Sequence, residues 1–286
     1  MRLRFLGMAL VVLTTALSAR AVSFRLDEDG AVVTWSSGVP GQDFRVGGKS
    51  HQWAQNFFLS VGGAAEKSLD ALATGIVTNY TTGPPYSDPT ATATWTTDDW
   101  TARVDFRLDG IPGGLPKARL YEDIAISNTS GDDLELSLYQ YVNFFLGATT
   151  GDQYVEIVDG EHAVQKDKYP AVTYWMGESV TGPAPDQWAV EDKNYPQTLR
   201  DGLKRSLLYW LNEGSKTDFG QVSGPLTGSG QNYEYVFQWD FTLGEGETFE
   251  IQKVKTVSLV PEPLTVLGVF LGVAGLGAYI RKRRIG

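Results

Sequence analysis

The chain has no cysteine and only two histidines in 286 residues. Without cysteine it can form no disulfide bond, thiolate metal site or cysteine nucleophile. His51 and His162 stand alone, outside any His-x-His or His-Glu-x-x-His pattern, so a zinc site of the usual kind is not expected. We expect each histidine to be a surface residue or a hydrogen-bonded part of the core, and we expect no cofactor.

Sequence signatures of catalysis are also scarce. The chain has no Gly-x-Ser-x-Gly nucleophile motif and no phosphate-binding loop. Acidic residues are plentiful, and glycoside hydrolysis needs two carboxylates that face each other across a cleft. The candidates for such a pair are Glu122, Asp123, Asp152 and Glu156. A carbohydrate-active enzyme is therefore an alternative, and a non-catalytic protein is the main interpretation.

Basic residues are few outside the two ends of the chain. Residues 22–259 contain 17 Lys and Arg against 33 Asp and Glu, which gives this body a net charge of −16. A surface of this sign repels nucleic acid and anionic lipid, so we expect neither as a partner of the body. The charge suits a soluble domain outside the cytoplasm, and the length allows one large domain or two small ones.

The last 27 residues, 260–286, consist of three parts in a fixed order. Pro261, Glu262 and Pro263 come first, and the two prolines keep this segment extended and outside any helix interior or sheet ladder. Residues 264–280 carry no charge and would span roughly 25 Å as a helix, the short end of what crosses a bilayer. The basic residues Arg281, Lys282, Arg283 and Arg284 follow, and we expect them to stay on the cytoplasmic side as a stop signal.

This tail resembles the PEP-CTERM sorting signal. The resemblance covers about a tenth of the chain, and its specificity comes from the three ordered elements together. It implies an exosortase substrate of a Gram-negative bacterium that makes extracellular polysaccharide. Such a protein is held transiently in the inner membrane and then cut near Pro261–Pro263. A membrane-anchored periplasmic domain without processing is the alternative.

The first 21 residues have the form of a secretory signal peptide. Arg2 and Arg4 make a charged start, residues 5–17 are apolar, and Ala19 and Ala21 fit the small-x-small cleavage rule. We expect cleavage after Ala21 and export across the inner membrane, with the cell surface or the extracellular space as the final location.

Between these signals the hydrophobic pattern predicts strands. Asp29-Gly30 and Asp159-Gly160 each separate two short apolar runs, which is a hairpin signal. The strand expected at 134–146 has polar residues between its leucines, so one of its faces should be wet, as in an antiparallel sheet. Residues 206–211 also have the pattern of a strand.

The clearest alternation of large apolar residues runs from 233 to 243. We expect this strand to pair, through a turn at 244–247, with a strand at 248–259 whose phase shifts at a bulge near Val254. Together these patterns predict one antiparallel β-sandwich over residues 22–259. Two β subdomains divided near 177–205 are the alternative.

Several tryptophans lie in or beside the expected loops, where core packing explains them less well. These are Trp53, Trp95, Trp100, Trp175 and Trp188. A flat ring on a loop or on a concave sheet can stack on a sugar, so these five are candidate glycan-stacking residues, with packing inside the sandwich as the competing explanation. The sequence thus predicts an exported surface or matrix protein, with exosortase and the polysaccharide of a biofilm as its expected partners.

The processing hypothesis makes a prediction for the mature protein from its native host. Its intact mass should correspond to a chain that starts near Val22 and ends near Pro261–Pro263, measured separately in the cell and medium fractions. A mass that still includes residues 281–286 would contradict processing and indicate an ordinary tail anchor.

Overall fold

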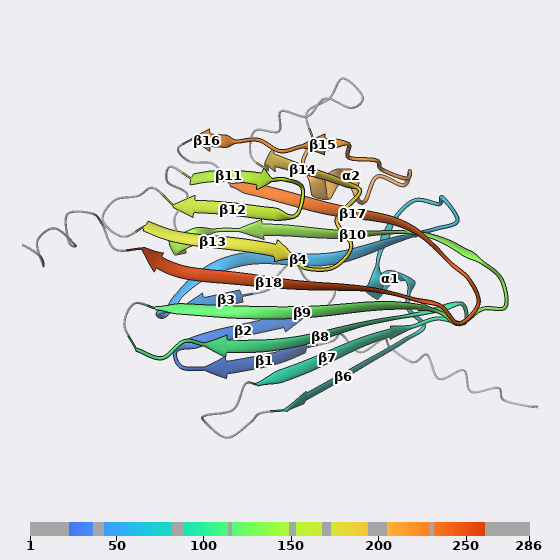
Figure 1. The fold of residues 1–286 in the computed structure, drawn as a ribbon, viewed down its shortest axis with the longest axis horizontal. Coiled ribbons are helices and arrows are strands. Elements are labelled where there is room, and N and C mark those ends of the chain that lie inside the picture. Colours follow the sequence, from blue (N-terminus) through green and yellow to red (C-terminus); the bar gives the residue numbers. More distant parts are fainter. Residues whose placement is uncertain are drawn as a thin grey trace, which may run out of the picture.

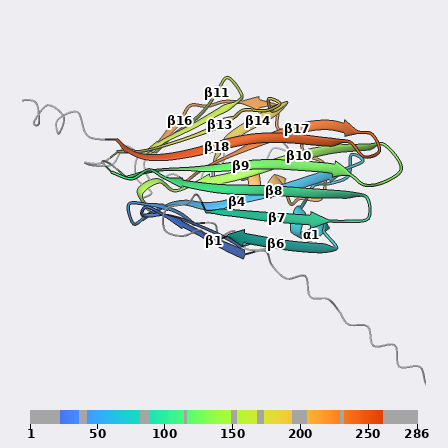
Figure 2. The ribbon, with the colours of Figure 1, turned by 60° about the horizontal axis from the view of Figure 1, so that its bottom comes forward.

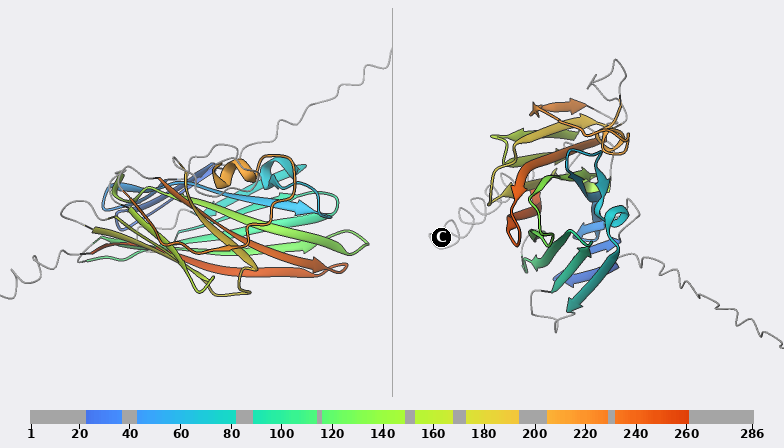
Figure 3. Two further views of the ribbon diagram at one scale, coloured as in Figure 1. Left: turned by 90° about the horizontal axis from the view of Figure 1, so that it is seen from above. Right: turned by 90° about the vertical axis from the view of Figure 1, so that its right-hand side faces the viewer.

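Two nine-stranded sheets face each other in the computed structural model (Figure 1). The structure describes residues 23–36, 43–81, 89–113, 116–148, 153–167, 173–193, 205–228 and 232–260. All described strand pairs are antiparallel except the short parallel pair between β14 (Gln187–Asp192) and β15 (Gln221–Val222). The expected antiparallel β-fold is therefore confirmed, and Figure 3 shows the two layers from above and from one end.

The first sheet, sheet A, contains the N-terminal strands and the strands on either side of the second helix. Its strands, in spatial order, are β1 (Ser23–Glu28), β2 (Ala31–Ser36), β3 (Asp43–Val46), β4 (Lys49–Val61), β10 (Leu134–Phe144), β17 (Tyr233–Leu243), β14 (Gln187–Asp192) and β15 (Gln221–Val222), with β5 (Lys67–Ser68) paired to β4.

The second sheet, sheet B, is open to solvent along much of its outer side. Its strands, in spatial order, are β16 (Leu226–Gly228), β11 (Gln153–Val158), β12 (His162–Asp167), β13 (Thr173–Val180), β18 (Thr248–Val260), β9 (Lys117–Asn128), β8 (Trp100–Gly110), β7 (Thr90–Thr96) and β6 (Gly75–Thr81). The short helices are α1 (Leu69–Leu72), η1 (Leu146–Ala148) and α2 (Leu207–Trp210).

Both predicted hairpins are confirmed. The turn between β1 and β2 has positive φ angles at Asp29 and Gly30, and the turn between β11 and β12 has them at Asp159 and Gly160. An Asp-Gly pair supplies these angles with little strain because glycine has no side chain and aspartate tolerates the left-handed region.

The strands β17 and β18 follow each other along the chain but do not pair, so that prediction is wrong. β17 pairs with β10 and β14 in sheet A, whereas β18 pairs with β9 and β13 in sheet B. Each strand has one apolar face, and stacking the two sheets buries both faces against each other. One continuous cluster of buried residues fills the interior, with Trp95, Phe237 and Trp239 among its largest members.

Strands from before and after residues 177–205 are neighbours in both sheets, as in the pairs β10–β17 and β9–β18. They also share the continuous interior cluster. Strands from the two sides of that segment are therefore interleaved within each sheet. Figure 2 shows the same interleaving from a second direction.

A second apolar layer covers the outer face of sheet A. Leu207 and Trp210 of α2, with Leu211 and Phe219 of the segment that follows, pack on Tyr139 and neighbouring outer-face side chains of β4, β10, β14 and β17. Residues 206–211 therefore form a helix capped by Ser206 rather than the expected strand. For the same reason β10 is buried on both faces from Leu136 to Phe144, and its expected wet face is limited to its first residues.

Within the ranges described above, no helix has both the length and the apolar character needed to span a bilayer. The predicted span at 264–280, the sorting motif, the basic cluster and the signal peptide lie outside those ranges.

The packing of β8 against the first hairpin makes a prediction. A Cβ added at Gly110 would lie 2.3 Å from the backbone oxygen of Glu28, so Gly110→Ala should lower the free energy of unfolding by about 1–3 kcal/mol. Gly75→Ala is the matched control, because nothing lies within 4 Å of a Cβ there. Equal denaturation midpoints for the two variants would contradict this packing.

Candidate functional site

Three of the four candidate acidic residues, Glu122, Asp123 and Glu156, lie in the described part of the chain, and these three do not meet in a cleft. Glu122 and Asp123 are neighbours on β9 and point to opposite faces, with Glu122 fully buried between the sheets and Asp123 on the outer face. Glu156 lies on the outer face of β11, where it accepts a hydrogen bond from Tyr154. Asp152 lies outside the described residues.

The candidate glycan-stacking tryptophans are dispersed. Trp95 and Trp100 are buried in the interior, at 1% and 3% exposure, because each points inward at the end of a strand of sheet B. Both rings are therefore core residues. Trp188 is half-buried, and its indole N–H donates to Ser223 at 3.0 Å. Trp175 is half-buried on sheet B, and the side chain of Trp53 is not among those that the structure describes.

The rings of Trp175 and Trp188 each lie against a glycine, but only Trp188 also packs against the interior cluster. The ring of Trp175 lies against Gly177, where a Cβ would come within 2.5 Å of the ring. Only glycine allows this approach, so the ring rests on the strand and stays partly accessible on the outer face of sheet B. Of the five candidates, Trp175 best keeps the properties of a stacking residue.

Four charged side chains meet in the interior, where none of them is exposed to solvent. They are Lys253 and Lys255 of β18, Glu122 of β9 and Glu178 of β13. The ammonium nitrogen of Lys253 lies 2.8 Å from Glu122 and 3.0 Å from Glu178. That of Lys255 lies 2.6 Å from Glu122 and 3.4 Å from Glu178. We call these four residues the interior charge cluster.

Sheet A supplies the hydrogen-bonding partners that close the cluster from the other side. Gln55 of β4 donates to the Oε1 atom of Glu122 at 2.9 Å. Gln140 of β10 donates to the Oε1 atom of Glu178 at 3.0 Å, and Tyr235 of β17 donates to the Oε2 atom of the same glutamate. The cluster therefore joins the two sheets through polar contacts in the middle of an apolar interior.

Burial and mutual attraction act in opposite directions on these charges. Burial raises the pKa of Glu122, but Lys253 and Lys255 outweigh it and bring that pKa to about 2. Burial lowers the pKa of Lys255 below its ordinary value, whereas the two glutamates outweigh burial at Lys253 and raise its pKa. Of the two lysines, Lys255 thus gives up its proton more readily.

The interior charge cluster corrects the prediction of a bulge near Val254. The register of β18 against β9 continues without a shift from Thr248 to Ser258. The inward positions of β18 are Ile251, Lys253, Lys255 and Val257. Every second residue therefore points inward, and this alternation continues through the two lysines. The pattern of the sequence suggested a change of phase because a lysine is rarely buried without a partner, and the partners come from distant strands.

Histidine placement agrees with the expected structural roles. His51 is buried, the backbone N–H of Gly147 donates to its Nδ1 atom at 3.1 Å, and its Nε2 atom lies 3.2 Å from the carbonyl oxygen of Val46. Burial lowers the pKa of His51 to about 4, which keeps it neutral. His162 lies at the surface beside Asp159. Among the described residues, no group of three or more His, Asp or Glu is placed to hold a metal ion.

A groove of 330 Å³ lies on the outer face of sheet B, across β7, β8 and β9. The guanidinium of Arg107 lies 3.8 Å from the ring centre of Tyr121. Asp105 forms an ion pair of 2.9 Å with Arg103 and accepts a hydrogen bond from Thr92. We call this feature the β8 groove.

The β8 groove also contains two carboxyl groups on neighbouring strands. Asp105 and Asp123 are direct partners in the register of β8 and β9, and like charges in this arrangement destabilise a sheet. Burial, followed by the charge of Asp105, raises the pKa of Asp123. Asp105, by contrast, has Arg103 and Thr92 to stabilise its charge. The two acids therefore occupy different electrostatic environments.

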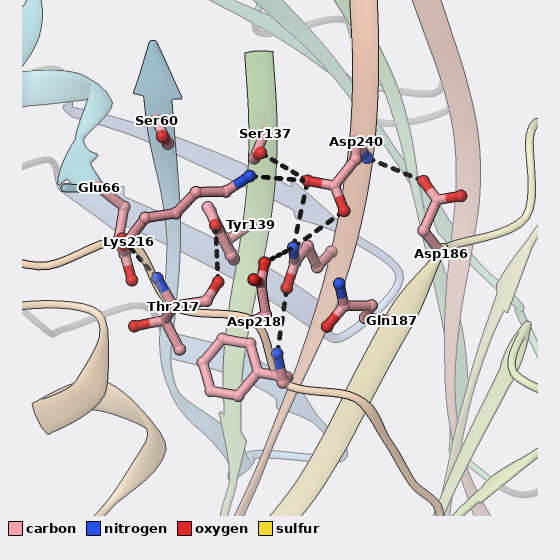
Figure 4. Close-up of polar contacts among 12 residues, drawn as sticks. Ser60, Glu66, Ser137, Tyr139, Asp186, Gln187, Lys216, Thr217, Asp218 and Asp240 are labelled. Carbon is pink, nitrogen blue, oxygen red and sulfur yellow. Dashed lines mark hydrogen bonds and ion pairs between the residues drawn. The ribbon is translucent and has the colours of Figure 1, made fainter. Parts of the chain in front are cut away.

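The polar side chains on the outer face of sheet A bind another segment of the chain, as Figure 4 shows. The backbone N–H of Thr217 donates to Glu66 at 3.2 Å, and the Thr217 carbonyl accepts from Tyr139 at 2.8 Å. Lys216 lies 3.8 Å from Asp240, which also accepts from Ser137. These contacts fasten the segment after α2 onto the sheet, so this face is closed by the chain itself.

The buried carboxyl of Glu234 holds α2 in the same way. It accepts hydrogen bonds from the backbone N–H of Leu207 at 2.5 Å and from the hydroxyl of Tyr141 at 2.7 Å. Burial raises the pKa of Glu234 to about 7, although both hydrogen bonds act to lower it.

Comparisons with known proteins leave the family open. No family model matches the chain, and no curated protein matches it. Among solved structures, a bacterial glucoamylase in complex with acarbose aligns over 88% of this chain and 32% of its own, with 8% identity and a TM-score of 0.48. A protein described as a kojibiose phosphorylase from the human microbiome aligns over 82% of this chain and 30% of its own, with 10% identity and a TM-score of 0.39.

The chain spans about a third of the length of these two structures. At such scores and identities the likenesses decide neither the family nor the activity, and the site must be judged on its own geometry.

The raised pKa of Glu234 makes a prediction about pH dependence. The carboxyl of Glu234 binds its proton more tightly in the folded chain than in the unfolded one. Its contribution to the free energy of unfolding is therefore greatest below the ordinary pKa of 4.5 and falls as the pH rises to about 7. A tenfold difference in proton affinity between the folded and unfolded chain corresponds to about 1.4 kcal/mol, so the ionisation of Glu234 should cost roughly 3 kcal/mol at neutral pH.

We therefore expect Glu234→Gln to be more stable relative to the native protein at pH 8 than at pH 4, by roughly that amount. Chemical denaturation at both pH values measures it, and Glu135→Gln, at an exposed carboxyl, is the control. A difference between native and Glu234→Gln protein that is the same at both pH values would contradict the argument.

Proposed function

We propose that this chain is an exported, non-catalytic protein of the bacterial surface or extracellular matrix, and that it binds polysaccharide on the outer face of sheet B. Its C-terminal segment acts as a PEP-CTERM-like signal for exosortase, through Pro261, Glu262 and Pro263. The four basic residues after the apolar run hold it in the inner membrane until it is processed. The observation that supports binding at this face is the β8 groove.

The chemistry of the β8 groove suits a polyhydroxylated ligand. Planar donors on Arg103 and Arg107 and acceptors on Asp105 and Asp123 line it together with threonine hydroxyls, and such groups match the alternating donors and acceptors of a sugar. Tyr121 supplies an aromatic ring in the same groove, and Trp175 supplies a second one on the same face of the sheet. Several weak contacts spread over a flat face fit a long chain better than a small metabolite.

The closed outer face of sheet A supports this choice of face. There, α2 and the segment after it occupy the surface that a ligand would use. On sheet B the side chains of β7, β8 and β9 reach solvent directly. This difference between the two faces supports a ligand on sheet B.

One observation favours a second candidate function, hydrolysis of a glycosidic bond. Asp105 and Asp123 lie side by side in the β8 groove, and burial together with the charge of Asp105 raises the pKa of Asp123, as a proton donor requires. In that case Asp123 would be the proton donor, and Asp105 would be the second carboxyl group of the pair.

Retention of the purified mature protein on immobilised exopolysaccharide from its host tests the proposal. Tyr121→Ala and Arg107→Ala should each weaken binding about tenfold, a loss of about 1.4 kcal/mol, because each removes one side of the stacked pair. Arg25→Ala is the matched control, since Arg25 forms a similar exposed pair with Asp27 at 2.9 Å on sheet A.

Assay of reducing ends in the same incubations separates the two candidates. Retention without new reducing ends supports the binding protein. Reducing ends that disappear in Asp123→Asn would establish the hydrolase instead, and equal retention of all variants would contradict a ligand in the β8 groove.

A further inference from the structure

Within and beside the interior charge cluster, the amine of Lys255, the carboxylate of Glu122 and the carboxamide of Gln55 contact one another in that order. The Oε1 atom of Glu122 is 2.6 Å from the nitrogen of Lys255 and 2.9 Å from the Nε2 atom of Gln55. One carboxylate oxygen thus holds both nitrogens, which places the lysine amine and the glutamine carboxamide within a few ångströms of each other. Gln55 comes from sheet A and Lys255 from sheet B.

We propose that Lys255 and Gln55 form an intramolecular amide bond that joins the two sheets, with Glu122 transferring the protons. The substrate of this modification is the protein itself, and the reaction needs no enzyme, cofactor or oxidant. The proposal rests on the cluster alone and is independent of the ligand proposed for the β8 groove.

The proton and electron balance of the reaction closes within the three residues. Lys255 first passes a proton to the Glu122 carboxylate, and the free amine attacks the side-chain carbonyl carbon of Gln55. A new C–N bond forms, the bond from that carbon to Nε2 breaks, and the amide nitrogen leaves as ammonia with a proton delivered by Glu122. The second proton released by the amine remains on the carboxyl group, so the net charge of the cluster is unchanged.

The surroundings meet the needs of each step. All four charged side chains are fully buried, so water does not compete as a nucleophile or solvate the amine. Burial lowers the pKa of Lys255, which raises the fraction of free amine, as in other activated lysines. Lys253 lies 2.8 Å from the second oxygen of Glu122, and its charge lowers the pKa of that carboxyl group, so Glu122 passes the proton that it accepts on to the leaving amide nitrogen.

A second set of contacts resembles the first but is less suited to the reaction. Glu178 binds Lys253 at 3.0 Å and Gln140 at 3.0 Å through the same oxygen. However, the two glutamates raise the pKa of Lys253, and Tyr235 occupies the other oxygen of Glu178. The structure therefore assigns the bond to Lys255 and Gln55 rather than to Lys253 and Gln140.

The decisive measurement is the mass of the folded full chain, produced in a bacterium and then denatured. The expected mass is one ammonia molecule lower than the sequence requires, after the two termini have been assigned from their own peptides. After trypsin digestion, the peptide of residues 50–67 should be attached through Gln55 to a peptide that contains Lys255 and was not cut after it.

Three results would overturn the proposal. A full sequence mass would leave the cluster as a set of ion pairs. A loss of one water molecule would indicate an amide between a lysine and a glutamate, and a branched peptide that joins Lys253 to Gln140 would assign the reaction to the other set of contacts.

Three variants test the roles of the individual residues, and no conclusion depends on a single variant. Gln55→Leu should restore the full sequence mass, and Gln252→Leu, at an exposed glutamine of the same strand as Lys255, should keep the ammonia deficit. Glu122→Gln should slow formation of the bond at least tenfold in a time course after synthesis. A deficit that persists in Gln55→Leu would contradict the assignment even if the native protein shows one.

Discussion

Lys253 and Lys255 carry two positive charges into an interior from which water is excluded. Burying an ion costs several kcal/mol unless a partner is well placed, so β18 is stable only between strands that present carboxylates at the same level. Glu122 on β9 and Glu178 on β13 meet this condition. A slip of β18 by one residue would turn the lysines outward and leave both glutamates unpaired. The cluster thus fixes the register of the three central strands of sheet B.

The outer faces of the two sheets differ because a segment of the chain covers one of them. Residues 205–222 lie on sheet A, where α2 and Phe219 pack on apolar side chains and Glu234 holds the start of α2. No comparable segment of the described chain covers β7, β8 and β9, so their outward residues alternate strictly with the core. One face therefore serves stability, and the other is available to a ligand.

The sequence predicted what depends on local chemistry. Asp29-Gly30 and Asp159-Gly160 specify their turns through backbone preferences alone, and the alternation at 233–243 identifies the inward residues of β17 directly. Prediction from the sequence failed where a distant segment of the chain determines the local structure. The apolar partners of Leu207 and Trp210 come from sheet A, so 206–211 could not be told from a strand. The lysines of β18 looked exposed because their glutamates lie more than 70 residues away in the chain. Trp95 and Trp100 looked accessible because strand ends could not be told from loops.

The position of β18 also bears on how the protein could be held by its C-terminal segment. β18 is a central strand, paired along its length with β9 on one side and β13 on the other, and it ends at Val260, where that segment begins. A pull on an edge strand can break its hydrogen bonds one at a time, whereas a pull along a central strand must shear two ladders together. Lys255 of the interior charge cluster lies five residues from Val260, and the glutamates that bind both lysines of β18 accept hydrogen bonds from Gln55 and Gln140 of sheet A. The body can therefore bear a load at this end without losing an edge strand first.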